Sequence, residues 1–277
     1  MKNMTTRQLR LLAKYKPILY LHKKEEISPL SFEEYIYNSE LYNGENNTLL
    51  ISCENITFPL SDEIKNLNNK YLNYVGGFVS PNYYRIKYVP YYGFVYEYKN
   101  HIDIVYIFNY FYKKSYKWFN INIGKQHQCD IKHIRIRINK QETHIIGIYF
   151  EGYNKDLGMW ILNENNNIEF ENNDNLKQHP IIYVSKHSHV CYPKKGKWIK
   201  SFGFMNDYTN KGIYWYPNHV INLDAHDNDL LSYNGKMDNS KKINNINREH
   251  YKIAPEIKNK NLVYRFFYPI SKYIKFI

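Results

Sequence analysis

Seven short runs of β-branched and aromatic residues occur between positions 83 and 184, and Gly, Pro, Asn and Lys separate them. Runs of this length and composition are typical of β-strands, and their close spacing favours antiparallel pairing. The sequence therefore predicts an all-β fold, mainly an antiparallel β-sandwich. The runs are residues 83–89, 93–98, 102–112, 131–138, 144–150, 158–162 and 181–184.

Two short helices are expected ahead of these strands. Residues 5–8 (Thr-Thr-Arg-Gln) and residues 31–34 (Ser-Phe-Glu-Glu) each have the spacing of a capping box, which marks the start of a helix. Pro17 ends the first helix because it cannot continue the helical hydrogen bonds, and residues 18–21 follow as a strand.

All 277 residues are expected to form a single β-sandwich domain. Residues 1–40 contain the N-terminal helices and the first strand. Residues 201–223 are predicted to be mostly irregular, and residues 232–249, which are poor in apolar side chains, are predicted to form a mobile loop. Residues 262–277 are an aromatic, basic tail with two open interpretations: a final strand, or a segment that docks on a partner or a membrane surface.

The chain is basic, with 38 Lys and Arg against 26 Asp and Glu and a formal net charge of +12. Such a surface favours nucleic acid, anionic lipid or acidic proteins as partners. We expect the partner to be a protein or an anionic surface. Nucleic acid stays an alternative partner that no recognisable motif supports. Asn, Lys, Ile and Tyr are abundant and have AT-rich codons, while long Asn or Gln tracts are missing. This composition leads us to expect a viral protein of a large DNA virus, with virion components among its partners.

Cys53, Cys129 and Cys191 cannot all pair with one another, and no Cys-x-x-Cys motif occurs. Free thiols are typical of a reducing compartment, so we expect an intracellular protein, carried in the virion if the source is viral. The N-terminus is polar, and no apolar run is as long as a membrane span. Neither a secretory signal nor a transmembrane segment is therefore expected.

Residues 126–138 contain the first group of candidate site residues. Isoleucines at alternate positions of 134–138 predict a strand with those side chains pointing inward. The same alternation places Asp130 and Lys132 on the isoleucine side, at the polar edge of the core. An unpaired buried ammonium group is costly. Lys132 is therefore predicted to contact a carboxylate or a cluster of carbonyls close to His189.

Imidazoles and hydroxyls gather directly after the run 181–184. A strand that ends in convergent polar groups is a common place for a site in a β protein. One open alternative is that His127 and His133 are solvent-facing, and another is that His187 and His189 satisfy backbone carbonyls. A zinc site on His187, His189 and Cys191 lacks the spacing of a structural zinc motif. The candidate polar site takes seven residues from the two segments: His127, Asp130, Lys132, His133, His187, Ser188 and His189.

Three further sequence features indicate a family. Residues 13–22 read Ala-Lys-Tyr-Lys-Pro-Ile-Leu-Tyr-Leu-His, and residues 107–112 form an aromatic strand. A His-Pro-x-x-Tyr-x-x-x-x-Ser-His pattern is met by His179, Pro180, Tyr183, Ser188 and His189. With these features the chain resembles the vacuolar protein sorting-associated family of the sixty-two type over most of residues 10–225. More distantly it is similar to the necrosis-inducing toxins, whose related acidic motif lines a divalent-cation pocket on a β-sandwich.

The chain departs from the family at the acidic motif, His-Glu-Gly-Asp-Trp-Glu-His. His127, Asp130 and His133 keep their places, whereas Gln128 and Lys132 replace the two glutamates and an isoleucine replaces the tryptophan. Three acids on one strand face would bind a hard cation through oxygen ligands. The resemblance therefore implies a degenerate metal site here, and we expect no cofactor and no metal. The alternative is a divalent cation held by Asp130 and His189.

The leading hypothesis is a non-catalytic β-sandwich that acts as an interaction or surface-binding protein. No catalytic residue is assigned under this hypothesis. One alternative is a metal-dependent hydrolase that uses Asp130, His133 and His189 as metal ligands or as acid and base. The other is a basic nucleic-acid-binding protein that combines tyrosine stacking with phosphate contacts.

Overall fold

Strands dominate the structure, so the predicted all-β class is confirmed. It is a computed structural model, and it describes residues 2–57, 61, 69–118, 121–123, 126–151, 158–164, 167–171, 179–201, 205–225, 229–233, 235–239 and 248–252. The predicted C-terminal tail, residues 262–277, lies outside the described residues. Among the described residues, no helix is long and apolar enough to cross a bilayer.

Short helices flank the strands. The helices are α1 (Lys2–Lys14), α2 (Phe32–Tyr37), α4 (Tyr83–Ile86) and α5 (Arg248–Lys252), with 3-10 turns η1 (Cys53–Asn55) and η4 (Asp229–Ser232). The strands are β1 (Ile18–Tyr20), β2 (Ser39–Asn43), β3 (Leu49–Ile51), β4 (Lys70–Tyr74), β5 (Tyr91–Glu97), β6 (His101–Lys113), β7 (Tyr116–Trp118), β8 (Ile121–Ile123), β9 (His127–Asn139), β10 (Ile145–Phe150), β11 (Met159–Leu162), β12 (Ile181–Val184), β13 (Cys191–Tyr192), β14 (Gly196–Ser201), β15 (Met205–Thr209), β16 (Tyr214–Trp215) and β17 (Val220–Asn222).

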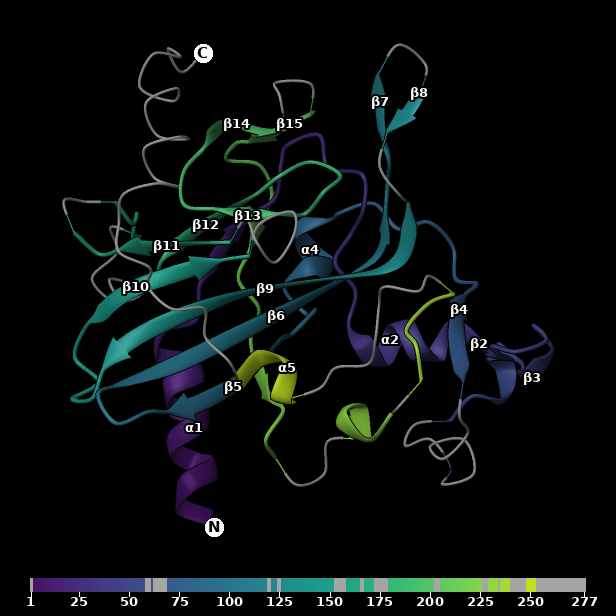
Figure 1. Cartoon of the computed structure of the whole chain (residues 1–277), viewed down its shortest axis with the longest axis horizontal. Helices are drawn as coiled ribbons and strands as arrows, with labels where there is room; N and C mark the ends of the chain where they lie inside the picture. The colour runs from purple at the N-terminus through teal and green to yellow at the C-terminus, as the bar shows by residue number, and fades with distance from the viewer. Residues whose placement is uncertain are drawn as a thin grey trace.

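Two sheets form the body of the molecule (Figure 1). One has six strands in the order β11-β10-β9-β6-β5-β17, and the other has four in the order β13-β12-β1-β16. Most neighbours are antiparallel, as predicted, but β1 pairs with β12 and β17 pairs with β5 in parallel. A three-stranded sheet, β3-β2-β4, and the pairs β7-β8 and β14-β15 complete the described strands.

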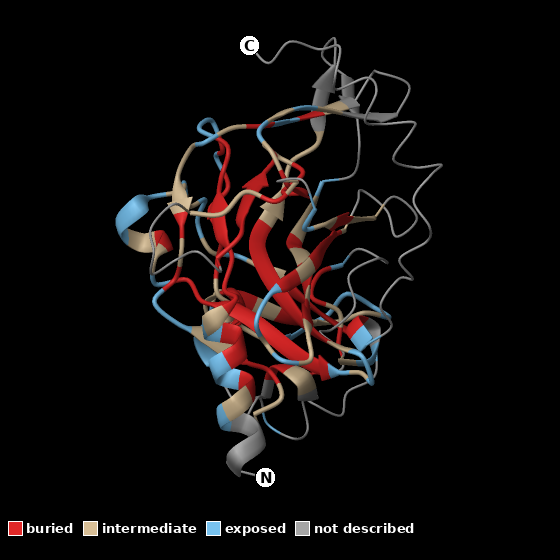
Figure 2. Ribbon diagram, turned by 90° about the vertical axis from the view of Figure 1, so that its left-hand side faces the viewer, coloured by how far each residue is buried: buried red, intermediate tan, exposed pale blue. Residues whose placement is uncertain are grey.

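The indole of Trp215 on β16 connects the two sheets. Its ring centroid lies 4.8 Å from that of Tyr91, 5.7 Å from Phe108 and 6.1 Å from Tyr110, each in an edge-on arrangement. All four rings are fully buried, and Figure 2 shows the buried residues concentrated in the central strands. Because large rings fill the space between the sheets, they fix the distance at which β9 faces the loop after β12.

The four-stranded sheet is apolar on both faces. Leu19 and Ile182 join the main core, whereas Ile18, Tyr20 and Tyr183 belong to a second cluster on the opposite face. Successive side chains of a strand point to opposite faces, so β1 and β12 each contribute to both clusters. Since this sheet is covered on both sides, its strands read as continuous apolar runs rather than alternating ones.

Several predicted boundaries are confirmed and one is displaced. β12 spans the predicted residues, and α2 begins as predicted, with Ser31 Oγ accepting a hydrogen bond from Glu34 N at 3.0 Å. α1 ends before Pro17, but it starts at Lys2, ahead of the cap predicted at residues 5–8. A capping pattern can lie inside a helix when the preceding residues also favour the helical conformation.

The strand predicted for residues 83–89 is wrong. The first four of these residues form α4, because the side chain of Asn82 accepts a hydrogen bond from Tyr84 N at 2.8 Å and caps the helix. The irregular segment predicted for residues 201–223 is also wrong, since it contains β15, β16 and β17. β16 and β17 pair with the distant strands β1 and β5, a long-range effect that local composition does not show.

A buried carboxylate ties two arginines to the outer side of the six-stranded sheet. Asp103 on β6 accepts a hydrogen bond from Arg135 Nη1 at 3.2 Å and two from Arg137, from Nε at 2.8 Å and from Nη2 at 2.9 Å. Arg135 also donates to the carbonyl oxygen of Tyr251, so α5 packs over this network. Asp103 and the Arg135 side chain are almost completely buried.

Replacing Asp103 should therefore be costly. We expect Asp103→Ala to lower the free energy of unfolding by about 3–5 kcal/mol, because it leaves buried guanidinium charge without a carboxylate. Urea denaturation measures this loss. The matched control is Glu97→Ala, which removes a one-third-exposed carboxylate that contacts Arg7 and Lys140 and should cost less than about 1 kcal/mol. Equal losses of unfolding free energy in the two variants would show that the buried network stabilises the fold no more than an exposed ion pair does.

Candidate functional site

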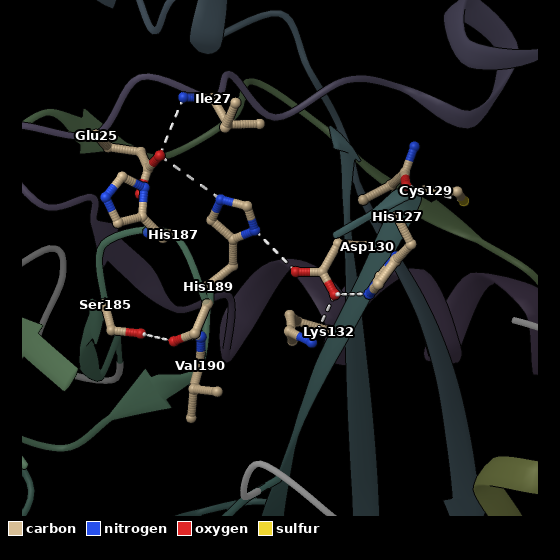
Figure 3. Close-up of polar contacts among 12 residues, drawn as sticks. Glu25, Ile27, His127, Cys129, Asp130, Lys132, Ser185, His187, His189 and Val190 are labelled. Atoms are coloured by element: carbon tan, nitrogen blue, oxygen red, sulfur yellow. Dashed lines mark hydrogen bonds and ion pairs between the residues drawn. The ribbon is translucent and has the colours of Figure 1, made fainter. Parts of the chain in front are cut away.

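The candidate site lies where three segments meet (Figure 3). The first part of β9 supplies Asp130 and Lys132, the loop between β12 and β13 supplies His189, and the chain after β1 supplies Glu25. The site thus joins the six-stranded sheet to the four-stranded sheet. Figure 3 shows the four side chains pointing toward one another.

Asp130 is the centre of the site. Its carboxylate is 2% exposed, and its two oxygens have different partners. Oδ1 lies 2.7 Å from Lys132 Nζ, and Oδ2 lies 2.8 Å from His189 Nδ1. The contact predicted for Lys132, with a carboxylate close to His189, is therefore present. Alternation along β9 explains it, because residues 130 and 132 share one face of the strand.

His189 is enclosed on all sides. Its side chain is completely buried, and the Tyr110 ring stacks on it at a centroid distance of 3.9 Å and an interplanar angle of 6°. Its second nitrogen, Nε2, lies 3.7 Å from Glu25 Oε1. One imidazole therefore lies between two carboxylates, Asp130 and Glu25, and both favour its protonated form.

Glu25 is held by the main chain. Its Oε1 accepts hydrogen bonds from the backbone N–H groups of Glu26 at 2.9 Å and Ile27 at 3.0 Å, and its Oε2 accepts one from His187 N at 2.9 Å. Burial opposes ionisation of Glu25, but the His189 charge and these hydrogen bonds outweigh it and lower its pKa to about 2. Glu25 is therefore ionised at neutral pH although it is buried.

The other charges of the site follow the same balance. Burial opposes ionisation of Asp130, yet Lys132 and His189 hold the pKa of its carboxyl well below the usual range. Burial likewise opposes protonation of His189 and Lys132, but the neighbouring carboxylates raise both pKa values. Asp130 and Lys132 are therefore charged at neutral pH, as Glu25 is, and the same neighbours favour the protonated form of His189.

Three residues at the site have left-handed backbone conformations, which residues other than glycine rarely adopt. Cys129 has φ 50°, His187 has φ 65° and His189 has φ 52°. Such conformations cost on the order of 1–3 kcal/mol each and persist where surrounding contacts impose them. Cys129 stands where the family motif has glycine, the residue that tolerates this conformation best. The left-handed turn at His187 directs its N–H to Glu25.

The remaining candidates divide into two groups. His127 borders the site, with Nε2 3.7 Å from Asp130 Oδ1, and burial lowers its pKa. His133 instead pairs with Glu151, Nδ1 to Oε2 at 2.9 Å. Ser188 points into a separate hydroxyl network, where its Oγ lies 2.8 Å from Asp207 Oδ1. The structure thus brings His127, Asp130, Lys132 and His189 together, with His187 contributing its backbone, and it leaves His133 and Ser188 outside.

Glu25 and Tyr110 are site residues that the sequence analysis missed, and Glu151 is the partner of His133 that it missed. Glu25 follows the family-like segment of residues 13–22, which is the signal that could have drawn attention to it. Glu151 directly follows β10, and the pairing of Phe150 with Ile134 places it next to His133. Tyr110 pairs with Asp130 across β6 and β9, so the hairpin register identifies it as a neighbour.

Gln128, which stands where the family motif has a glutamate, has a structural role. Gln128 Oε1 accepts a hydrogen bond from Tyr74 N at 2.7 Å, and Gln128 Nε2 donates to Tyr74 O at 2.9 Å. A carboxylate could accept the first bond but could not donate the second. Gln128 therefore links β9 to the end of β4 and is not free to serve as a cation ligand.

These contacts do not fit the divalent-cation site that the family motif implies. Both Asp130 oxygens are engaged by cationic groups, and an ammonium occupies the place of one acid. Within the described part of the chain, no three His, Cys, Asp or Glu side chains are grouped to hold a metal ion. Burial raises the pKa of the Cys191 thiol to about 12 and that of Cys129 well above its ordinary value, so both thiols stay protonated.

Comparison with solved structures finds weakly similar proteins. Necrosis and ethylene inducing protein 2 from the causal agent of witches' broom disease of cocoa is 12% identical, with a TM-score of 0.40, and the match covers 79% of this chain and 76% of that one. The non-toxic HaNLP3 protein is 15% identical, with a TM-score of 0.39 and coverage of 81% and 79%. NLPPya in complex with mannosamine is 9% identical, with a TM-score of 0.39 and coverage of 77% and 72%.

The family assignment rests on the sequence model. A search of curated proteins finds no match. The model of the family described as vacuolar protein sorting-associated protein 62 matches residues 1–214. This range contains β1, β9, β12 and the loop that carries His189, and thus every segment that builds the site. The chain therefore belongs to the vacuolar protein sorting-associated protein 62 family.

Proposed function

We propose that this protein is a non-catalytic β-sandwich binding module in which Lys132 takes the place of a bound cation. The observation that carries the proposal is the 2.7 Å contact between Lys132 Nζ and Asp130 Oδ1. Lys132 stands at a glutamate position of the family motif, so a ligand for a cation has been exchanged for a cation. The ammonium neutralises Asp130 from within the chain, where the family pattern would use a metal ion.

Charge balance supports this proposal. Asp130 and Glu25 contribute two negative charges, and His189 and Lys132 contribute two positive charges. These four groups together are neutral, so Asp130 and Glu25 are already balanced by cations of the chain itself. The role of the site is then to hold β9 against the loop that carries His189, as a buried ion-pair network does when every member is paired.

The hydrolase alternative finds less support. It needs Asp130, His133 and His189 to act together, but His133 pairs with Glu151 instead. A general acid or base must come within hydrogen-bonding distance of the substrate. His189 is 0% exposed and lies beneath the Tyr110 ring, so a substrate has no access to it in this conformation.

The proposed partner is a protein or an anionic surface, which the net charge of +12 favours. The finer proposal is an intracellular protein of a large DNA virus that is packaged with other virion components. Quantitative mass spectrometry of purified particles tests it. Enrichment of the chain with the structural proteins supports the virion assignment, and its strict absence refutes that assignment.

Loss of Lys132 should destabilise the fold. We expect Lys132→Ala to lower the free energy of unfolding by about 1–3 kcal/mol, because it leaves one oxygen of a buried carboxylate without its donor. The control is Lys140→Ala, whose ammonium is 35% exposed and 3.7 Å from Glu97 Oε2. That change should cost less than about 1 kcal/mol in the same denaturation experiment. Similar losses for both would contradict a special role of Lys132.

Restoring the family glutamate should restore some cation affinity. In Lys132→Glu the site changes from neutral to two negative charges, so Ca²⁺ or Mg²⁺ should raise the melting temperature of this variant. The wild type and Lys132→Gln, which adds no carboxylate, should show no such shift. Calorimetric titration with the metal alone checks the result. A stoichiometric ion bound by the wild type and lost in Asp130→Ala would contradict the proposal that Lys132 is a built-in cation, which means that its ammonium group takes the place of a bound metal ion.

Stability should depend on pH through His189. The pKa of His189 is raised in the folded protein. Its contribution to the free energy of unfolding is therefore complete below the unfolded-state pKa of about 6.5 and is lost as pH rises through the folded-state pKa. Asp130 and Glu25 have lowered pKa values, so their contributions are present above about pH 4 and are lost in acid. The free energy of unfolding should therefore be greatest between about pH 5 and 6.5.

Two histidine variants separate this effect from the rest of the protein. His189→Gln should remove most of the decline in stability above pH 6.5, whereas His219→Gln, at an exposed histidine, should retain it. Denaturation across the pH range provides the measurement. If His189→Gln and the wild type lose stability in parallel as pH rises, the imidazole is not charged in the folded state.

A further inference from the structure

Three tyrosines at and directly after α4 are the most exposed aromatic group of the described residues. Tyr83 is 55% exposed, Tyr84 is 74% exposed and Tyr88 is 62% exposed. In Figure 2 this short helix projects from the side of the molecule, with its outer turn exposed. Large aromatic side chains gathered in one place on a surface indicate an interaction site, whereas singly exposed ones are common and need no explanation. We refer to Tyr83, Tyr84, Lys87 and Tyr88 as the tyrosine tip.

The helix that displays the tyrosine tip is firmly anchored. Ile86 is completely buried, and the Asn82 side chain caps the helix through Tyr84 N. The carbonyl oxygen of Lys87 accepts a hydrogen bond from Asn218 N at 3.1 Å, which ties the segment to the chain beyond β16. The tyrosines are therefore presented by a fixed support, which lowers the entropy that a partner must overcome.

Positive charge accompanies the exposed rings. Lys87 Nζ lies 5.0 Å from the centroid of the Tyr88 ring. In the segment before α4, Phe78 is 57% exposed, and Lys114 Nζ, which also pairs with Glu26, lies 4.8 Å from its centroid. Arg85 pairs with Glu34 and thereby neutralises a nearby carboxylate. The tip thus combines exposed aromatic rings with the ammonium group of Lys87, in a chain with a net charge of +12.

This combination matches the chemistry of an anionic bilayer surface. Tyrosine places its ring among the upper acyl chains and its hydroxyl among the headgroups, the arrangement of the aromatic belts of membrane proteins. Lysine keeps its ammonium in water beside an anionic headgroup while its alkyl chain lies against apolar surface. The projecting form also suits a broad surface, whereas an extended peptide or a helix requires a groove.

We propose that the tyrosine tip docks the protein on membranes that contain anionic phospholipid. This inference rests on the proposed function, because it names the partner of the surface-binding module. The tip is distant in sequence from Asp130 and shares no residue with the ion-paired site. Membrane docking and the built-in cation can therefore be tested separately.

Vesicle sedimentation with the full chain tests the inference. The wild type should partition onto vesicles of phosphatidylcholine with about 30% phosphatidylserine, more weakly at high salt, and little onto pure phosphatidylcholine. The triple variant Tyr83→Ser, Tyr84→Ser, Tyr88→Ser should lower the partition coefficient about tenfold or more. Lys87→Glu should lower it about fivefold, since it removes one attraction and adds a repulsion. Circular dichroism and the melting temperature verify that both variants fold.

Tyr208→Ser is the matched control, because Tyr208 is 50% exposed on β15, away from α4. It should bind vesicles as the wild type does. Equal binding by the wild type and the triple variant would overturn the role of the tip while leaving a surface-binding function in place. No binding of the wild type to anionic vesicles would overturn the membrane partner and favour an acidic protein. Neither result bears on the Lys132→Glu cation titration, which decides the built-in cation independently.

Discussion

A carboxylate buried between two sheets is the constraint on which the rest of the site depends. Asp130 lies on the six-stranded sheet, and burial without a cation would make its charge untenable. Lys132 supplies one partner from the same strand, and His189 supplies the other from the four-stranded sheet. Glu25 then balances His189 from the chain after β1. The four charges therefore stabilise the approach of the two sheets at this place, so charge pairing and sheet packing support each other.

The same constraint explains the unusual backbone around the site. His189 reaches Asp130 from a loop whose residues 187 and 189 have left-handed conformations, and Cys129 bends β9 just before Asp130. Each conformation is unfavourable for a residue with a β-carbon. The ion pairs, the Tyr110 stack and the hydrogen bonds to Glu25 compensate for that cost. Strain at three positions therefore marks the place where tertiary contacts override local preference.

Much of the fold could be predicted from the sequence, because local residue patterns determine many of its elements. Period-two alternation identified β9 and the contact of Lys132 with a carboxylate, and a capping box identified α2. α4 was mistaken for a strand because its tyrosines have high β-propensity, while a single asparagine cap decides the helix. Glu25 and Tyr110 were missed because they reach the site through pairing between distant strands, which one sequence does not encode locally. His133 and Ser188 contact Glu151 and Asp207 rather than Asp130.

The two substitutions in the acidic motif differ in how far they can be reversed. Lys132 interacts mainly through its ion pair with Asp130, so a glutamate at this position changes the net charge of the site without breaking a hydrogen bond to the backbone. Gln128 donates and accepts hydrogen bonds with the main chain of Tyr74, so a glutamate there would lose the donor that links β9 to β4. Lys132 pairs with the buried carboxylate of Asp130, and Gln128 links two strands, so both side chains take part in holding the scaffold together. A binding function for such a scaffold has to use its outer surface, which is where the exposed tyrosines and lysines gather.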